Sequence, residues 1–139
     1  MASSPDPVRL TGRCECGAVR FALRGPPRPV INCHCAMCRR LHGHFAAYTA
    51  VAPDALLLVE QRGLRWYRSS DIAERGFCGE CGASLFWRPA HGRYVAVAAG
   101  ALDPPTGLRT AAHIFVADKG DYYDLSDDLP RHPQGSDTG

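Results

Sequence analysis

Three cysteines fall within a six-residue stretch of the sequence, at Cys33, Cys35 and Cys38. Thiols at such close spacing are typical of a bound metal ion rather than of a packed core. A structural zinc site takes four protein ligands, whereas a catalytic zinc site keeps three and leaves a fourth position for water or substrate. The spacing therefore predicts a zinc site with an open position.

The other four cysteines form two pairs, Cys14 with Cys16 and Cys78 with Cys81. In each pair the second cysteine is followed by Gly-Ala, two further residues and Phe. A glycine at that point can adopt positive φ, which turns backbone N–H groups toward the sulfurs before the chain leaves as a strand. Two such zinc knuckles supply the four thiolates of a closed structural site, so we expect two Zn²⁺ ions per chain.

Both clusters also allow other interpretations. The two pairs would suit structural thiols or a redox pair, and the triad would suit a redox or persulfide-carrying cluster. A histidine, His42 or His44, would also complete a closed site on the triad. His34 lies between two of the ligands, so its side chain is expected to point away from the metal.

Two arginines, Arg39 and Arg40, directly follow the triad. They would serve as solvated surface charges, as counter-charges to zinc-bound thiolates, or as the binding group for an anionic substrate. The sequence alone does not separate these roles.

The whole chain has 139 residues, the usual size of one domain. No apolar run is long enough to span a membrane, and residues 1–7 lack the apolar segment of a secretory signal. We therefore expect a cytoplasmic protein with no membrane partner. In that setting its seven cysteines are expected to bind metal rather than to form disulfides.

The charge of the chain argues against a nucleic-acid partner. The formal net charge is only +2, and seven zinc-bound thiolates would bring it closer to neutrality. The arginines at positions 62, 65, 68, 75 and 88 are scattered rather than gathered in one run, which favours a solvated surface.

The apolar pattern has the period of β-strands. Val19, Phe21 and Leu23 alternate with other residues, and eleven prolines and fourteen glycines interrupt the chain. A hairpin turn is expected at His91-Gly92 and a short turn of helix over residues 39–42. The predicted strands cover residues 19–23, 45–51, 55–59, 64–68, 84–88, 94–98 and 111–116. The prediction is an all-β domain at residues 8–130, with flexible tails at residues 1–7 and 131–139.

Three blocks of the sequence resemble one known family. They are GRCECG at residues 12–17, CHCAMCRRLHG at 33–43 and RGFCGECGASLFW at 75–87. This pattern resembles the glutathione-dependent formaldehyde-activating enzyme family, also called the centromere-protein-V family, and the resemblance covers about residues 9 to 132. One departure is that the family has a tryptophan shortly after Lys119, where this chain has Tyr122-Tyr123.

The resemblance implies an Mss4-like, all-β "tent" of short antiparallel strands held together by zinc. It also implies a division of the cysteines that agrees with their spacing. The structural zinc would bind Cys14, Cys16, Cys78 and Cys81. The catalytic zinc would bind Cys33, Cys35 and Cys38.

The function implied by the resemblance is that of a zinc-dependent carbon–sulfur lyase. Its substrate would be a small thiol–aldehyde adduct such as S-hydroxymethylglutathione, with glutathione as the thiol. The candidate catalytic residues are His34, Arg39 and Arg40, with His42 and His44 as further candidates for the proton donor. Glutathione carries carboxylates, which an arginine near the metal would bind.

Two alternatives to the lyase remain. A zinc-bound hydroxide at the same open position would hydrolyse a small carbonyl or imine substrate without any thiol. A zinc-stapled interaction module without catalysis would instead depend on exposed aromatic side chains, for which Trp66 and Tyr67 are the candidates.

Overall fold

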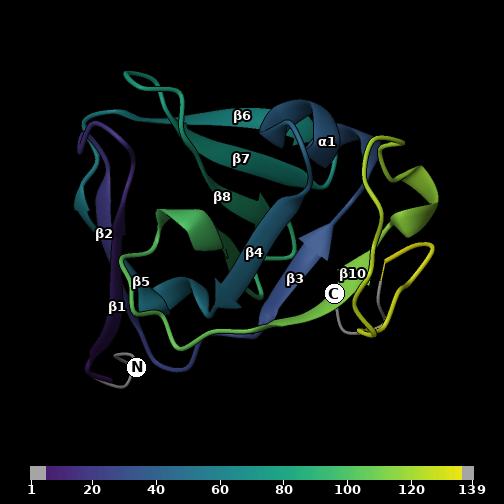
Figure 1. Ribbon diagram of the computed structural model, residues 1–139. Helices are drawn as coiled ribbons and strands as arrows, with labels where there is room; N and C mark the ends of the chain where they lie inside the picture. Colours follow the sequence, from purple (N-terminus) through teal and green to yellow (C-terminus); the bar gives the residue numbers. More distant parts are fainter. Residues whose placement is uncertain (1–5, 136–139) are drawn as a thin grey trace. The chain divides into compact units, whose positions relative to one another are not determined.

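A computed structural model describes residues 6–135 of the chain (Figure 1). It divides into two compact units, each assembled from segments that lie far apart in the sequence. Unit 1 comprises Met1–Arg28 and Thr49–Gly107, and unit 2 comprises Pro29–Tyr48 and Leu108–Gly139. Residues 1–5 and 136–139, which belong to the predicted tails, lie outside the described residues. The single domain predicted for residues 8–130 stays a prediction.

Unit 1 contains a three-stranded antiparallel sheet in the order β1-β2-β5. Its strands are β1 (Val8–Arg13), β2 (Arg20–Arg24) and β5 (Leu56–Glu60). It also contains an antiparallel run in the order β9-β8-β7-β6. These strands are β6 (Leu64–Ser70), β7 (Ala73–Cys78), β8 (Ser84–Pro89) and β9 (Val95–Ala98). Two single turns of 3-10 helix, η1 (Pro53–Ala55) and η2 (Ala99–Ala101), complete the unit.

An aromatic core holds unit 1 together. The ring of Phe21 on β2 meets that of Phe86 on β8 edge-on at 5.1 Å, and both side chains are buried. Trp66 on β6 stacks on Phe86 at 6.1 Å, and Arg88 lies over the indole. Gly76 on β7 leaves room for these rings, because a Cβ there would lie only 3.0 Å from Phe86 and Trp66. Such aromatic contacts add stability beyond the area that they bury.

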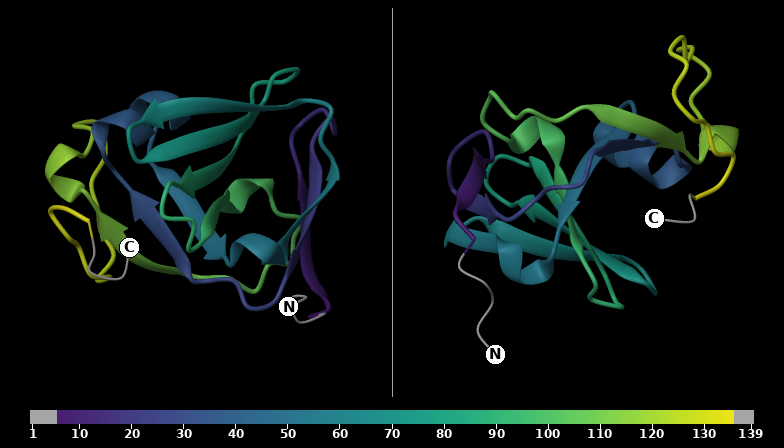
Figure 2. Two further views of the ribbon diagram at one scale, coloured as in Figure 1. Left: turned by 180° about the vertical axis from the view of Figure 1, so that it is seen from behind. Right: turned by 90° about the horizontal axis from the view of Figure 1, so that it is seen from below.

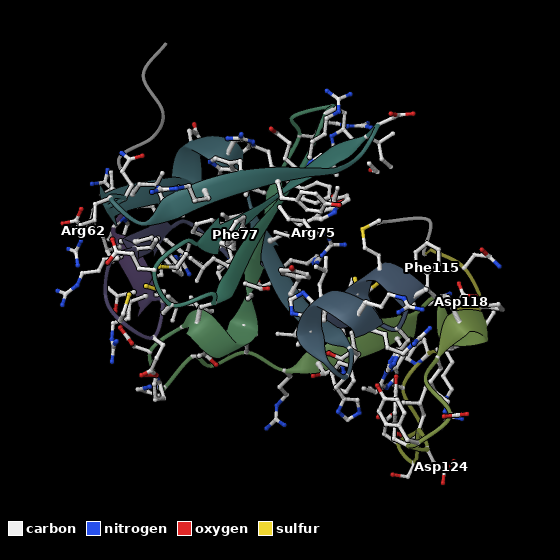
Figure 3. The ribbon with its side chains drawn as sticks, turned by 90° about the horizontal axis from the view of Figure 1, so that it is seen from above. Arg62, Arg75, Phe77, Phe115, Asp118 and Asp124 are labelled. Atoms are coloured by element: carbon white, nitrogen blue, oxygen red, sulfur yellow. The ribbon has the colours of Figure 1, made fainter. Side chains whose placement is uncertain are left out.

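Unit 2 is built around β3 (Val30–Cys33), which lies between β10 (Thr110–Ile114) and the first half of β4 (Ala46–Val51). The β3–β4 pairing is antiparallel, whereas β3 and β10 are parallel and lie side by side in both views of Figure 2. Helix α1 (Ala36–His42) follows β3, and the 3-10 turn η3 (Val116–Asp118) follows β10. Figure 3 labels Phe115 and Asp118 at this turn and Asp124 in the loop beyond it.

The predicted all-β architecture of short strands is confirmed, with two differences in detail. The resemblance implied antiparallel strands, but β10 runs parallel to β3. Strands β1, β3 and β7 were not predicted, because they lack a clean apolar alternation. All seven predicted strands are present within one or two residues of their expected ends, and the hairpin turn between β8 and β9 has Gly92 at φ +72°.

The C-terminal boundary of the folded part lies beyond residue 130. Arg131 forms a parallel bridge with His113, and the backbone N–H of His132 donates to the carbonyl of His113. Phe115 N–H likewise donates to the carbonyl of Gln134. The exposed edge of β10 offers these partners, so residues 131–134 of the predicted tail are ordered against it. Across the described part of the chain, the helices are too short or too polar to cross a bilayer.

Candidate metal centres

The four-cysteine cluster forms in unit 1 from two loops that lie 62 residues apart in sequence. Its four sulfurs all lie within 4.8 Å of one another. The Cys14–Cys16 sulfur distance is 3.8 Å and the Cys16–Cys78 distance is 3.7 Å, far too long for disulfides. Zinc–sulfur bonds of about 2.3 Å in a tetrahedron give sulfur–sulfur edges of roughly 3.8 Å. The cluster therefore fits a tetrahedral thiolate-bound metal.

Both loops have the geometry of zinc knuckles. Gly17 and Gly82 adopt φ values of +84° and +83°, as the sequence predicted. In the first loop Val19 N–H donates to Cys14 Sγ at 3.2 Å. In the second loop the N–H groups of Glu80 and Cys81 donate to Cys78 Sγ at 3.4 Å. These donors stabilise negative charge on the sulfurs before any metal is bound.

The thiols of this cluster have pKa values that diverge from one another. The backbone N–H of Ala83, followed by that of Cys16, lowers the pKa of Cys81 to about 6. For Cys16 the largest influence is the N–H of Ala18, which lowers the pKa. Desolvation and the neighbouring Cys78 thiol outweigh it and raise the pKa to about 11. Neighbouring thiolates repel one another, so a cation is needed for all four to ionise together.

The three-cysteine cluster, called the triad below, comes from one continuous segment of unit 2. Cys33 ends β3, Cys35 is the N-cap of α1, and Cys38 lies buried in the first turns of that helix. Cys35 Sγ accepts the N–H of Cys38 at 3.3 Å, so this thiol caps the helix as a serine hydroxyl would. The helix therefore begins three residues earlier than the sequence predicted.

The triad sulfurs also lie within 4.8 Å of one another. Hydrogen bonds from the thiols of Cys33 and Cys38 lower the pKa of Cys35, whereas the same sharing raises the pKa of Cys33. One thiolate is thus held by two thiols, and further ionisation again calls for a cation. Among the described residues, no histidine, aspartate or glutamate joins the triad within this distance, so neither His42 nor His44 is grouped with the three sulfurs here.

Two polar side chains share the triad's face of the sheet. Tyr48 pairs with Ile31 across β3 and β4, and Ile31 lies two residues before Cys33. Side chains two residues apart on a strand point to the same side, so Tyr48 lies on the face of Cys33. Its hydroxyl hydrogen-bonds to Nε2 of His42 on α1 at 3.2 Å. A histidine whose ring contacts Tyr48 therefore lies on the helix that carries Cys38.

The other face of β3 carries His34, whose side chain is fully buried. Its Nε2 lies 2.9 Å from Nδ1 of His113, which pairs with Asn32 across β3 and β10. Asn32 points away from the face of Cys33, so His34 points away from the triad, as the sequence predicted. Burial, followed by the electrostatic influence of the nearby His113, lowers the pKa of His34 to about 4, so the ring is neutral at pH 7.

The two arginines after the triad differ in exposure. Arg40 is exposed, whereas Arg39 is half-buried and its Nε has no hydrogen-bond partner in the described part of the chain. Both lie in the last turn of α1, where positive charge favours the helix dipole. A buried guanidinium nitrogen without a partner is costly, so Arg39 suits an anionic ligand better than Arg40 does.

Sequence reasoning missed three residues near the triad. These are His113, Tyr123 and Asp127, which join His34 in one hydrogen-bonded chain. A histidine inside the apolar run of β10 is the one signal in the sequence that would have marked this cluster, because a buried imidazole needs polar partners.

Comparison with known proteins agrees with this geometry. A family model described as "Glutathione-dependent formaldehyde-activating enzyme" matches residues 9–118. A Halomonas elongata protein named "Putative glutathione-dependent formaldehyde-activating enzyme" is 28% identical over 130 residues, covering 84% of this chain and 80% of its own length. An uncharacterized lyase of Schizosaccharomyces pombe is 26% identical over 117 residues, covering 83% of this chain and 84% of its own.

A solved structure shares the fold as well. The crystal structure of a Rhodobacter sphaeroides protein matches with a TM-score of 0.54 and 25% sequence identity. The match covers 68% of this chain and 88% of that protein. This match shows that the two proteins share a fold.

Proposed function

The chain belongs to the glutathione-dependent formaldehyde-activating enzyme family, and we propose that it makes or breaks the carbon–sulfur bond of a thiol–aldehyde adduct. S-hydroxymethylglutathione, formed from glutathione and formaldehyde, is the adduct that this family suggests. We further propose two Zn²⁺ ions per chain, one in each cysteine cluster.

One observation carries this proposal: three sulfurs converge, and no histidine, aspartate, glutamate or further cysteine of the described residues joins them. Three protein ligands with an open position are the arrangement of catalytic zinc. Zinc held there would supply a Lewis acid and would favour the thiolate form of a substrate sulfur. The four-cysteine cluster has no such vacancy, because its thiolates already complete a tetrahedron.

The proposed reaction moves one proton and forms one bond. The thiol sulfur bonds to the carbonyl carbon, the carbonyl π bond opens, and the thiol proton ends on the oxygen of the product hydroxyl. In the reverse direction the hydroxyl loses its proton, the carbon–sulfur bond breaks, and thiol and aldehyde are released. A histidine with a free pair of electrons near neutral pH suits either proton movement.

Among the histidines, we assign the proton transfer to His42 rather than to His34. His42 lies on α1 four residues after Cys38 and its ring contacts Tyr48, whereas both ring nitrogens of His34 are occupied by His113 and Tyr123. The catalytic role predicted for His34 stays a prediction, and its contacts favour a role in positioning. His44 lies against Tyr123, with ring centroids 4.2 Å apart.

For the substrate carboxylate we assign Arg39, with Arg40 as an exposed supporting charge. The unpartnered Nε of Arg39 would donate to a carboxylate oxygen, which removes the cost of leaving that group unpaired. This assignment predicts a preference for anionic thiols over neutral ones of similar size.

The test is the exchange rate between free formaldehyde hydrate and its glutathione adduct, followed by magnetisation-transfer NMR with ¹³C-formaldehyde. The uncatalysed exchange is measured in the same buffer. Zinc-loaded protein is expected to accelerate exchange, and Cys33→Ser is expected to return it to the uncatalysed rate. Tyr67→Ala, at an exposed site in unit 1, is the control and should retain the acceleration.

The same assay distinguishes the alternatives. Loss of a carbonyl or imine substrate without any added thiol would favour hydrolysis. Zinc-loaded protein that neither accelerates exchange nor binds a thiol would refute the proposed function and would leave the non-catalytic module in its place.

A further inference from the structure

Four side chains of unit 2 form a continuous series of hydrogen bonds, called the hydrogen-bond chain below, that includes His34 between two triad cysteines. Asp127 accepts from Nε2 of His113 at 2.9 Å, and His113 Nδ1 lies 2.9 Å from His34 Nε2. His34 Nδ1 lies 2.5 Å from the hydroxyl of Tyr123. His34 and His113 are 0% and 3% exposed, whereas Asp127 is at the surface. The chain thus leads from solvent to the peptide between two triad ligands.

The direction of the hydrogen bonds along these four side chains is determined by the carboxylate of Asp127 at one end. A carboxylate only accepts, so His113 carries a proton on Nε2, and in its neutral form it accepts on Nδ1. His34 must then donate from Nε2 and accept on Nδ1, which leaves the Tyr123 hydroxyl as the donor. All four ring nitrogens therefore have one partner each.

The backbone of residue 34 is fixed as firmly as its side chain. His34 N–H donates to the carbonyl of Ile114 at 2.9 Å. The peptide units on either side of this residue lead directly to Cys33 and Cys35. Rotation of this segment would break the backbone bond and both ring contacts together, so the two sulfurs are held in one orientation.

The loop that supplies Asp127 and Tyr123, residues 119–131, is itself tied down by cations. Lys119 Nζ donates to the carbonyls of Gly120 and Tyr123, and Arg131 donates to the carbonyls of Leu125 and Asp127. A loop without regular structure would otherwise lose little by moving. Its backbone is therefore rigid enough to fix the far end of the hydrogen-bond chain.

This loop also lies directly against α1, the helix that carries Cys38. A Cβ at Gly120 would lie 2.7 Å from Cε1 of Tyr122 and 3.2 Å from Cδ of Arg39, so the loop passes close to Arg39 of α1 at this glycine. The Tyr122 hydroxyl donates to the carbonyl of Gly43 at the end of α1. The loop thus contacts both segments that carry the triad.

Packing alone does not account for this cluster. Burying two imidazoles costs desolvation free energy, and apolar residues of similar size would fill the same volume without that cost. Outer residues that fix the orientation of metal ligands commonly change metal affinity when they are replaced.

We propose that Asp127, His113 and His34 are positioning residues that fix the orientation of Cys33 and Cys35, so that the C-terminal loop is part of the triad's metal site. This inference rests on the triad being the metal site of the proposed function, but not on the reaction. Its effect is on metal affinity at the triad and leaves the four-cysteine cluster unchanged.

The test follows zinc release from fully loaded protein to a chromogenic chelator, in which the two sites should give two separate phases. His113→Gln places an amide near the Nε2 position, so it keeps the contact with Asp127 but leaves His34 Nε2 without an acceptor. His113→Asn places an amide oxygen near the Nδ1 position and keeps that acceptor. We expect His113→Gln to weaken the triad's zinc roughly 10- to 100-fold, with His113→Asn closer to the wild type.

Two further variants keep the test decisive if the His113 variants do not fold. Tyr123→Phe removes one hydroxyl from a half-exposed residue and should accelerate zinc release from the triad several-fold, by analogy with other outer-residue losses. His132→Asn, a matched substitution in the same C-terminal segment but outside the chain of contacts, should release zinc as the wild type does.

Three outcomes would overturn the proposal. Equal loosening of both zinc phases would show general destabilisation instead of positioning, and wild-type release in both His113→Gln and Tyr123→Phe would show no effect on the ligands. Wild-type protein with one zinc per chain would refute the triad as a metal site and the proposed function with it. Protein with two zincs, a selective loss at the triad and no lyase activity would refute the reaction but support the positioning.

Discussion

The two cysteine clusters both present sulfur ligands, but they take these ligands from the sequence in different ways. The four-cysteine cluster draws its ligands from two loops separated by 62 residues, whereas the triad takes all of its ligands from residues 33–38. A cross-link between distant segments removes far more freedom from the unfolded chain than one within a short loop. The first cluster is therefore placed to staple the fold, whereas the second adds little to it, and under the proposed function its three ligands leave one position open.

Cys78→Ser should give the largest effect, because it removes a buried ligand of the staple. Structural zinc in small sites contributes about 10 to 16 kcal/mol of apparent binding free energy, which exceeds the stability of most domains. We expect unit 1 to unfold, with loss of the near-ultraviolet circular dichroism of Trp66 and Trp87. A folded variant with its thermal midpoint unchanged would remove the distinction between the clusters.

Cys33→Ser makes the matching change in the triad. We expect the zinc content, measured by elemental mass spectrometry, to fall from two per chain to one. The far-ultraviolet circular dichroism should stay the same and the carbon–sulfur exchange activity should be lost. Cys33 is only partly buried, so the hydroxyl costs little in packing. Unfolding comparable to that of Cys78→Ser would show that both clusters are structural.

Two glycine substitutions, one for each cluster, compare the clusters through smaller effects on stability. A Cβ at Gly63 would lie 2.9 Å from Cys78 Sγ and 2.8 Å from the Cβ of Ala18, so Gly63→Ala forces a ligand of the staple to move. Overpacking of this kind costs about 1 to 3 kcal/mol. We expect a lower thermal midpoint and faster zinc release from the four-cysteine cluster.

Gly43→Ala is the matched substitution on the triad's side. Gly43 ends α1 at φ +80° with no atom near its Cβ position, so alanine there costs only the strain of the left-handed conformation, about 1 to 2 kcal/mol. Zinc release from the four-cysteine cluster should stay as in the wild type. Accelerated release there would mean that the two clusters are coupled.

Arg39→Ala should have the smallest effect on the protein and a selective effect on the substrate. Loss of one carboxylate contact of about 1.4 kcal/mol corresponds to a tenfold rise in KM for glutathione. A neutral thiol should react with an unchanged KM, and Arg40→Ala, at the exposed neighbour, should change either value less. Steady-state kinetics with both thiols measure this, and a parallel rise for both would assign Arg39 to the fold.

Much of this arrangement follows from local sequence signals. The division of seven cysteines into four and three, the knuckle glycines and the strands with apolar alternation are all encoded within a few residues. Strand β7 was missed because its sequence, AERGFC, places glycine and charged residues where an apolar pattern would be expected. Gly76 belongs there because the rings of Trp66 and Phe86 fill the space of a side chain.

The hydrogen-bond chain next to the triad could not be predicted in the same way. His34 meets His113 across 79 residues and Tyr123 across 89. No local spacing rule joins residues so far apart, and the parallel pairing of β3 with β10 that brings them together is itself a long-range event. Residues 131–134 were assigned to a tail for the same reason, because their partners lie on β10.

The triad and the residues proposed to orient it lie far apart in the sequence, so the ribosome adds the triad first and these residues later. A chain made from its N-terminus has all three triad thiols after Cys38 and all staple ligands after Cys81, but Asp127 follows only 46 residues after Cys81. Throughout that interval the triad thiols exist without the groups that orient them. If these groups position the ligands as proposed, metal binding at the triad would reach its full strength only after the C-terminal loop has been made.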